Sequence, residues 1–183
     1  MTAGVVLSGC ASADGGDETT TSPTVTENPG NPWDLPIEQR PALFDPCAEI
    51  PIEAIEEGVG AKVDPNSSLT RHEPGSLMAC GWTNEQVHVT AAASWKSRAQ
   101  FLNDKSLRQV EQGGRRMRMV EVGDQTGSTC LQLFFTSRGA TWIKVDVVNG
   151  LGEFRGNRFV EACDALDQAI APLLKFVPEG DFK

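Results

Sequence analysis

The chain has 183 residues, with 25 acidic against 16 basic side chains and a formal net charge of −9. This length supports one domain with a sizeable hydrophobic core. The acidic balance argues against nucleic acid as a partner, because binding to phosphates depends on clustered Lys and Arg side chains. No apolar run approaches the roughly 20 residues of a membrane-spanning helix.

The first ten residues end in Leu7-Ser8-Gly9-Cys10, which resembles the lipobox of a bacterial lipoprotein. There, signal peptidase cuts before the Cys, and its thiol carries a diacylglycerol. The residues ahead of it form a short apolar stub without Lys or Arg, so we interpret 1–9 as the remainder of a longer signal peptide. We predict that Cys10 anchors the protein at the extracytoplasmic face of the cell membrane. The alternative is an ordinary Cys in a floppy N-terminus.

Residues 10–46 are predicted to be a disordered tether behind the anchor. The segment is rich in Thr, Pro, Gly and acidic residues, so it cannot bury enough apolar surface to offset the entropy of ordering. It holds seven acidic residues against Arg40 alone. Such a segment extends and holds a domain away from a surface. Its Thr-rich part could carry O-linked sugar, although we favour an unmodified spacer.

The remaining cysteines, Cys47, Cys80, Cys130 and Cys163, are even in number, which in an exported chain predicts two disulfides. Three connectivities are possible, and we favour Cys47–Cys80 with Cys130–Cys163, each separated by 33 residues. The alternative is four buried thiols in a cytosolic protein. None has C-x-x-C spacing, so zinc and thioredoxin-type chemistry are poorly supported.

We place the folded domain at residues 47–178, followed by a tail at 179–183. Its first half is predicted to contain two helices and a strand. Residues 51–58 have the starting Pro and the apolar spacing of a short helix. A polar loop follows at 64–75. Residues 87–95 alternate apolar and polar side chains like a strand, and Ser97 is placed to cap a helix through Leu107.

Three strands are predicted in the second half, at residues 115–122, 130–137 and 141–148. Gly139, between the last two, can take the positive φ of a hairpin turn. The last strand alternates a buried face with a face that is wet or partly covered, as antiparallel sheets allow. These faces are Ile143, Val145 and Val147 against Trp142, Lys144 and Asp146.

A closing helix is predicted over residues 158–175, with Asn157 as its N-cap and Pro172 expected to kink it or end it early. Its apolar stripe should pack on the sheet and turn Cys163 toward Cys130. The glycine-rich residues 150–156 are interpreted as a turn before this helix. The order of elements predicts an α+β fold, in which N-terminal and C-terminal helices pack on an antiparallel sheet.

The sequence offers little that indicates catalysis. His72 and His88 are interpreted as surface residues. The spacing of His, Cys and Asp suggests no metal site, and there is no visible Ser-His-Asp or Cys-His grouping. We therefore predict no catalytic residue, no metal and no cofactor.

A basic cluster stands out in this acidic chain. Arg115, Arg116 and Arg118 fall together in a predicted strand, behind a segment that also holds Lys96, Arg98, Lys105 and Arg108. The cluster could form a face for anionic lipid headgroups or cell-wall polymer. The alternative, which we favour, is a solvated strand edge whose cations block unwanted pairing.

Three motifs carry a family resemblance. They are Phe44-Asp45-Pro46-Cys47, Cys80-Gly81-Trp82 and Ala162-Cys163-Asp164-Ala165-Leu166. Together with the lipobox and the tether, they resemble actinobacterial cell-envelope lipoproteins with the domain of unknown function numbered 3558, over about residues 42–175. In that family the motif cysteines are thought to pair, which supports Cys47–Cys80. The family has no established activity to transfer. We expect Trp82 in the core, beside the sulfurs.

We therefore predict a lipid-anchored, extracytoplasmic and non-enzymatic domain that binds a partner protein, a lipid or a polysaccharide of the cell envelope. The alternative is a lipid or glycolipid carrier with an apolar cavity between sheet and helices. A third, weaker hypothesis is an envelope enzyme. A carrier needs a deep apolar pocket, whereas an enzyme needs a cleft with convergent polar groups of perturbed pKa.

Overall fold

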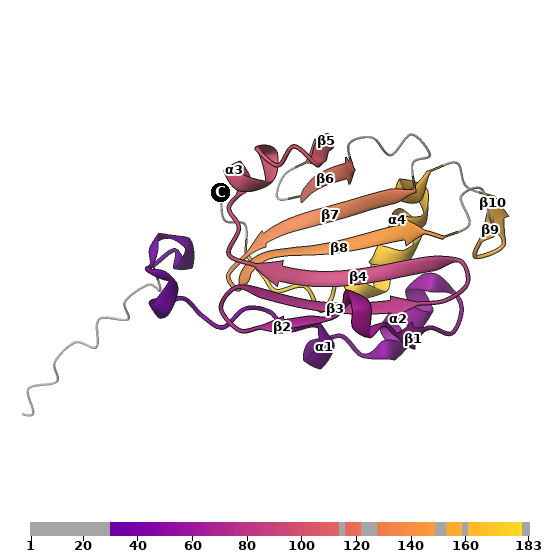
Figure 1. Ribbon diagram of the computed structural model, residues 1–183, viewed down its shortest axis with the longest axis horizontal. Coiled ribbons are helices and arrows are strands. Elements are labelled where there is room, and N and C mark those ends of the chain that lie inside the picture. The colour runs from indigo at the N-terminus through magenta and orange to yellow at the C-terminus, as the bar shows by residue number, and fades with distance from the viewer. Residues whose placement is uncertain (1–29, 114–115, 122–127, 149–152, 159–160, 181–183) are drawn as a thin grey trace, which may run out of the picture.

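The structure is a computed structural model that describes residues 30–113, 116–121, 128–148, 153–158 and 161–180. Its centre is an eight-stranded antiparallel sheet (Figure 1). In chain order the strands are β1 (Asp64–Pro65), β2 (Arg71–Glu73), β3 (Leu77–Thr83), β4 (Val87–Ser94), β5 (Leu107–Gly113), β6 (Arg116–Glu121), β7 (Thr129–Thr136) and β8 (Gly139–Val147). They are arranged as β1-β3-β4-β8-β7-β6-β5, and β2 also pairs with β3.

Four α-helices pack against this sheet: α1 (Pro46–Glu49), α2 (Ile52–Val59), α3 (Arg98–Leu102) and α4 (Ala162–Ile170). Helix α4 contacts β7 and β8, α2 contacts α4, and α1 contacts β3. We call the side of the sheet under these three helices the covered face. The other side, the open face, carries only α3 among the described α-helices, and α3 is five residues long.

The period-2 alternation of each strand gives the sheet two separate cores. The covered face holds the larger one, which includes Phe44, Ile55, Ile143, Leu166 and Leu173, each no more than 1% exposed. The open face holds a smaller cluster of Phe101, Met117, Met119, Leu131, Leu133, Phe135 and Ala140. The predicted alternation in β8 is confirmed. Ile143, Val145 and Val147 are buried, whereas Trp142 and Lys144 are partly exposed.

Two disulfides link the covered-face helices to the sheet. Cys47 of α1 is bonded to Cys80 of β3, and Cys130 of β7 is bonded to Cys163 of α4. Both pairs close loops with a sequence separation of 33. The favoured connectivity and the predicted α+β class are therefore confirmed.

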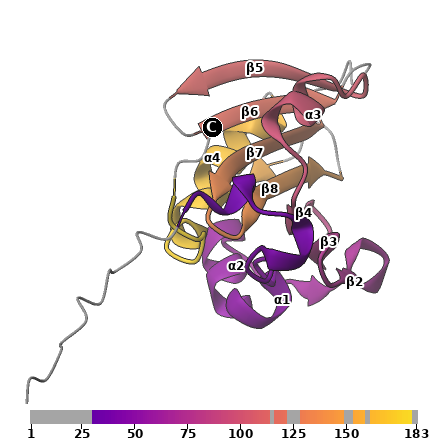
Figure 2. The same cartoon turned by 90° about the vertical axis from the view of Figure 1, so that its left-hand side faces the viewer.

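Residues 30–45, which we call the N-terminal strap, pack on one end of the sheet (Figure 2). The Trp33 indole donates from Nε1 to the backbone carbonyl of Thr136 at 2.9 Å and lies edge-on to Trp95, with ring centroids 5.0 Å apart. Phe44 is fully buried. The prediction of a disordered tether is wrong for residues 30–46, because a few isolated apolar side chains in a polar segment find partners far along the chain. Residues 10–29 lie outside the described residues.

Several predicted elements need correction in the first half of the domain. The structure has β3 at Leu77–Thr83, where no strand was predicted, and the polar loop at 64–75 holds the short edge strands β1 and β2. The helix predicted over 97–107 ends at Leu102 and is followed by β5. It ends there because Asp104 accepts hydrogen bonds from both the backbone and the hydroxyl of Ser106, which turns the chain.

The closing helix is shorter than predicted. Asn157 belongs to β10 (Asn157–Arg158), which pairs with β9 (Glu153–Phe154) in a two-stranded hairpin, so α4 begins only after Glu161. The prediction that Asn157 caps the helix is wrong, since Arg155 and Gly156 take positive φ and turn the chain back. The prediction for Pro172 is confirmed, because α4 ends at Ile170 and continues as a 3-10 turn, Ala171–Leu173.

The predicted helix at 51–58 is confirmed as α2, shifted by one residue so that Pro51 is its N-cap. Gly60 ends it with φ of 74°. The hairpin between β7 and β8 is also confirmed, with Gly139 at φ of 104°. None of the helices in the described ranges is long and apolar enough to cross a membrane.

Candidate ligand pocket

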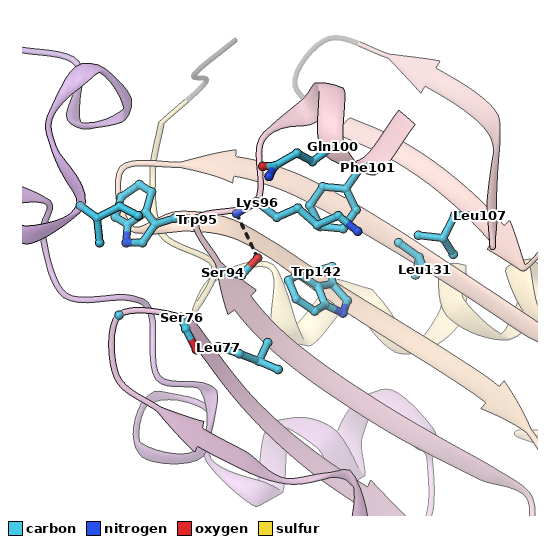
Figure 3. A pocket seen from close by; sticks show the side chains of 12 residues that line it. Ser76, Leu77, Ser94, Trp95, Lys96, Gln100, Phe101, Leu107, Leu131 and Trp142 are labelled. Atoms are coloured by element: carbon cyan, nitrogen blue, oxygen red, sulfur yellow. Dashed lines mark hydrogen bonds between the residues drawn. The ribbon is translucent and has the colours of Figure 1, made fainter. Parts of the chain in front are cut away.

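A pocket of about 590 Å³ opens on the open face, between α3 and the sheet (Figure 3). Its size falls within the roughly 300–1,000 Å³ of small-molecule sites. Its walls are mainly apolar and come from segments far apart in the chain: Leu77, Trp95, Phe101, Leu107, Leu131 and Trp142. The pocket is an open hollow that a ligand can enter directly.

The floor of the pocket follows from strand register. Leu131 in β7 pairs with Lys144, and Leu133 pairs with Trp142 in β8, so these side chains project from the same face. Trp142 therefore stands on the face opposite Ile143, where covered-face helices cannot reach it. Trp142 thus forms an aromatic part of the floor, on the face of β8 that was predicted to be wet or partly covered.

Helix α3 forms the wall over this floor. Ser97 caps it by accepting from the backbone of Gln100, whose side chain accepts from the backbone of Ser97 in return. This capping box fixes the first turn and directs Phe101 onto Trp142, with ring centroids 5.7 Å apart. A reciprocal cap of this kind holds a helix that is too short to be stable alone.

The rim of the pocket comes from the strap and from the β2–β3 hairpin. Ile37 lines the rim and is 58% exposed, which is unusual for so large an apolar side chain. Gly75, another lining residue, turns the hairpin with φ of 85°. The hydroxyl of Ser76 donates to Glu73 at 2.9 Å, which ties the turn to its own strand.

Lys96 is the charged residue among the pocket's lining residues. Its ammonium lies 4.6 Å from the Phe101 ring centroid and 2.6 Å from a carboxylate oxygen of Asp104. The hydrogen bond from Lys96, together with those from Ser106, holds the pKa of Asp104 well below its usual range. The Asp104 carboxylate therefore stays ionised beside Lys96 across the physiological pH range.

A polar row continues along the open face beyond Trp142. Lys144 bridges Asp146 at 3.0 Å and Glu121 at 3.6 Å. The hydroxyl of Thr129 donates to Asp146 at 2.7 Å. The open face is thus apolar beneath α3 and charged farther along the strands.

The predicted basic cluster does not form a ligand face at Arg118. This side chain is on the covered side of β6, where it bonds to Asp167 of α4 and to Gln132. Arg116 lies in β6, and Arg115 lies outside the described residues. For β6 the alternative of a sheet edge is also wrong, because β5 and β7 pair with its two sides. Arg108 of the same cluster lies in β5, the strand at the end of the sheet.

The other predicted residues are placed as follows. Trp82 is 4% exposed and belongs to the covered-face core, as expected. His72 is exposed, and His88 is partly buried and bonds through Nδ1 to the hydroxyl of Thr83 at 2.6 Å. Across the described ranges, no group of three or more His, Cys, Asp or Glu could hold a metal ion. Cys10 lies outside these ranges.

A family model described as a protein of unknown function, DUF3558, matches residues 5–175. The chain belongs to this family. No curated protein and no solved structure matches it.

The motifs that carry the resemblance to DUF3558 have structural roles in this chain. In Asp45-Pro46-Cys47, the Asp45 carboxylate accepts from the backbone of Cys47 at 3.0 Å, Pro46 opens α1, and the thiol of Cys47 forms the disulfide.

The second DUF3558 motif combines three packing requirements. Cys80 completes the disulfide, and Trp82 fills the core beneath it. A Cβ built on Gly81 would lie 2.2 Å from the Cβ of Leu69, so only glycine lets the 3-10 turn Ser67–Leu69 lie this close to β3. This motif therefore has a structural origin and does not mark a ligand site.

Sequence reasoning missed the pocket as a site. Its lining residues come from the strap, the β2–β3 turn, five strands and helix α3, and the sheet register brings the strand residues together. The one signal available was Trp142, a large aromatic residue on the strand face predicted to be wet. Nothing in the spacing of Trp95, Phe101 and Trp142 identified them as neighbours.

Proposed function

We propose that this DUF3558 protein is a lipid-anchored, extracytoplasmic and non-enzymatic lipoprotein that binds a small amphiphile on its open face. The observation that carries the proposal is the pocket under α3, whose aromatic and aliphatic walls stand open to solvent. Exposed apolar surface in a hollow of this size favours a ligand with an apolar part. The pocket thus favours the carrier hypothesis over a site for a polar partner protein.

Location at the cell envelope has two supporting observations. The family match begins at residue 5 and so includes Leu7-Ser8-Gly9-Cys10 within the sequence shared by the family. Both disulfides belong to the domain, and such bonds persist in oxidising compartments outside the cytoplasm. These observations support the proposal of a cell-envelope lipoprotein with Cys10 as the anchor.

The proposal of binding without catalysis rests on the lining of the pocket. Lys96 is held in an ion pair with Asp104 and lies on an aromatic ring, so it is poorly suited to act as a base. The other lining side chains are apolar, hydroxyl or amide groups. A general acid or base needs a titrating group aimed at the substrate, and these walls offer a binding surface instead.

The binding test uses two exposed apolar residues as a matched pair. Ile37 lines the pocket and is 58% exposed, whereas Leu102 is 49% exposed and is absent from its lining. We expect a single-chain amphiphile to change the fluorescence of Trp95 and Trp142, and Ile37→Ser to weaken its binding several-fold. Leu102→Ser should leave the affinity unchanged. Equal effects of the two variants, or no fluorescence response, would contradict the proposal.

The anchor is tested separately. In a strain that exports the protein, Cys10→Ala should move it from the membrane fraction to the soluble extracytoplasmic fraction. The four disulfide cysteines provide the internal control, because they should remain oxidised in both forms. An unchanged membrane fraction would show that Cys10 is not the anchor.

A further inference from the structure

Cationic side chains gather on the aromatic residues at the strap end of the pocket. The guanidinium of Arg40 lies 5.0 Å from the Trp95 ring centroid, and that of Arg98 lies 4.7 Å from the Phe135 ring centroid. Both rings contact Trp33, at 5.0 and 6.0 Å between centroids. Arg40 and Arg98 therefore flank one aromatic cluster, whose member Trp95 lines the pocket.

These two arginines keep unused charge and unused hydrogen-bond donors. Arg40 donates through Nε and Nη2 to the backbone carbonyls of Leu35 and Trp33, at 2.9 and 3.1 Å. Within the described part of the chain, no carboxylate lies within ion-pair distance of Arg40 or Arg98. The Nε of Arg98 is buried without a hydrogen-bond partner in the same residues.

A buried guanidinium N–H without an acceptor destabilises the protein, because its hydrogen bond to water is lost and not replaced. An anion at this place would supply the acceptors. Lys96 adds a third cation, although Asp104 neutralises it. The local charge is therefore positive in a protein whose formal net charge is −9.

We propose that the pocket binds a single-chain anionic lipid, with its hydrocarbon chain on Trp142 and Leu131 and its headgroup between Arg40 and Arg98. The apolar floor under α3 accommodates the chain, and the two guanidiniums at the strap end complement the negative charge. The inference rests on the proposed function, which requires only an amphiphile, and it adds the charge of the headgroup and its position.

The experiment compares two lysolipids with the same acyl chain, lysophosphatidylglycerol and lysophosphatidylcholine, below their micelle concentrations. Each is titrated into the full chain, and tryptophan fluorescence gives Kd. Both headgroups contain phosphate, but only the first lipid has a net negative charge. We expect the anionic lipid to bind about tenfold more tightly, which is the scale of one charge-assisted hydrogen bond.

The lead variant is Arg98→Gln, since Arg98 makes no hydrogen bond in the described residues that folding would lose. It should abolish most of the preference for lysophosphatidylglycerol and leave the affinity for lysophosphatidylcholine unchanged. Arg40→Gln should act in the same direction. Arg158→Gln, an exposed residue in β10, is the matched control and should change neither affinity.

The outcomes separate the two proposals. Equal affinities for both lysolipids, or a preference that survives Arg98→Gln, would overturn the anionic headgroup site and leave the amphiphile pocket standing. Binding of neither lysolipid would overturn both. Glycerol phosphate alone should bind weakly, because it lacks the chain, and equal binding would assign the site to a free phosphate. Binding to anionic vesicles without binding of lipid monomers would assign the arginines to a membrane surface and overturn the pocket site.

Discussion

The two faces of the sheet are formed by the same strands but differ in what packs on them. On the covered face, α1, α2 and α4 bury a continuous core, and two disulfides fix α1 and α4 to strands β3 and β7. On the open face, a single five-residue helix held by a capping box stands over an aromatic floor and leaves a hollow of about 590 Å³. The larger core and both disulfides are therefore on one face, and the proposed binding surface is on the other.

A single alternating strand can contribute to the packed core on one face and to the pocket on the other. In β8, Ile143 faces the helices and is fully buried, while its neighbour Trp142 faces the pocket. The sequence can change on one side of the strand without altering the packing on the other. Substitutions on the covered face should change folding first, and those on the open face should change binding first.

The largest expected effect comes from removing a disulfide on the covered face. Cys130→Ala with Cys163→Ala should lower the free energy of unfolding by about 4 kcal/mol, because the loop of 33 residues no longer limits the unfolded chain. Urea denaturation under oxidising conditions measures the loss. Amphiphile binding below the unfolding transition should remain. Loss of binding in a still folded variant would show that the two faces are coupled.

Gly58→Ala tests the packing of α2 on α4. A Cβ at this position would lie 2.3 Å from the backbone carbonyl oxygen of Ala169, so the two helices must separate. Alanine favours a helix by roughly 0.5–1 kcal/mol, but overpacking costs about 1–3 kcal/mol, so we expect a net loss of about 1–2 kcal/mol. Thermal unfolding measures it. Gly30→Ala is the control, since no atom lies within 4 Å of its added Cβ. A stabilised Gly58→Ala variant would contradict the close helix contact.

The open face is tested by lengthening the acyl chain of the amphiphile one methylene at a time. Each methylene that enters the pocket should add about 0.8 kcal/mol to the binding free energy, until the chain exceeds the floor beside Trp142 and Leu131. Calorimetric titration of the series gives this slope and its plateau. A slope near zero from the shortest chain onward would show that the apolar floor does not contact the chain.

The smallest effects concern one ion pair on each side of the sheet. Hydrogen bonds from Lys96 and Ser106 lower the pKa of Asp104. Burial raises the pKa of Glu49, but the hydrogen bond from Arg138 outweighs this effect and the pKa is lowered overall. A carboxyl with a lowered folded-state pKa stabilises the fold above its unfolded pKa of about 4, and the contribution is lost as pH falls below that value.

We therefore expect Asp104→Asn and Glu49→Gln each to destabilise the protein by at most about 1 kcal/mol at pH 7, because both pairs are partly exposed. The difference from wild type should shrink as pH falls from about 5 to 3. Urea midpoints across this range measure it. A difference that does not depend on pH would show that the ion pairs are not its cause.

Much of the domain was accessible from local patterns. Alternation located β4 and β8, and helical spacing located α2, because each of these elements has a buried side and a more exposed side. Strand β3 was missed because its central residues, 78–82, are all buried and show no alternation. The face of β3 at Gly81 is covered by Leu69, which belongs to the segment that was predicted to be a polar loop.

The remaining errors have a common physical cause. The stripe from Phe159 to Leu173 has helical spacing throughout, yet the chain turns at Arg155 and Gly156 and pairs β10 with β9 before α4 begins. The strap was misjudged for the same reason, since Trp33 is held by a carbonyl 103 positions away. Contacts between distant segments decide these cases. The carrier hypothesis expected an apolar cavity, but the residues that line the pocket could not be identified, because only such contacts bring them together.

The order of the two disulfides along the chain has a topological consequence. The crosslinked loops, 47–80 and 130–163, follow one another without nesting or interlocking. Residues 81–129, which include α3 and the pocket wall at Trp95 and Phe101, thus lie outside both loops. Helix α3 is therefore held by neither disulfide, so amide exchange should be fastest over α3 while the crosslinked side of the molecule stays protected.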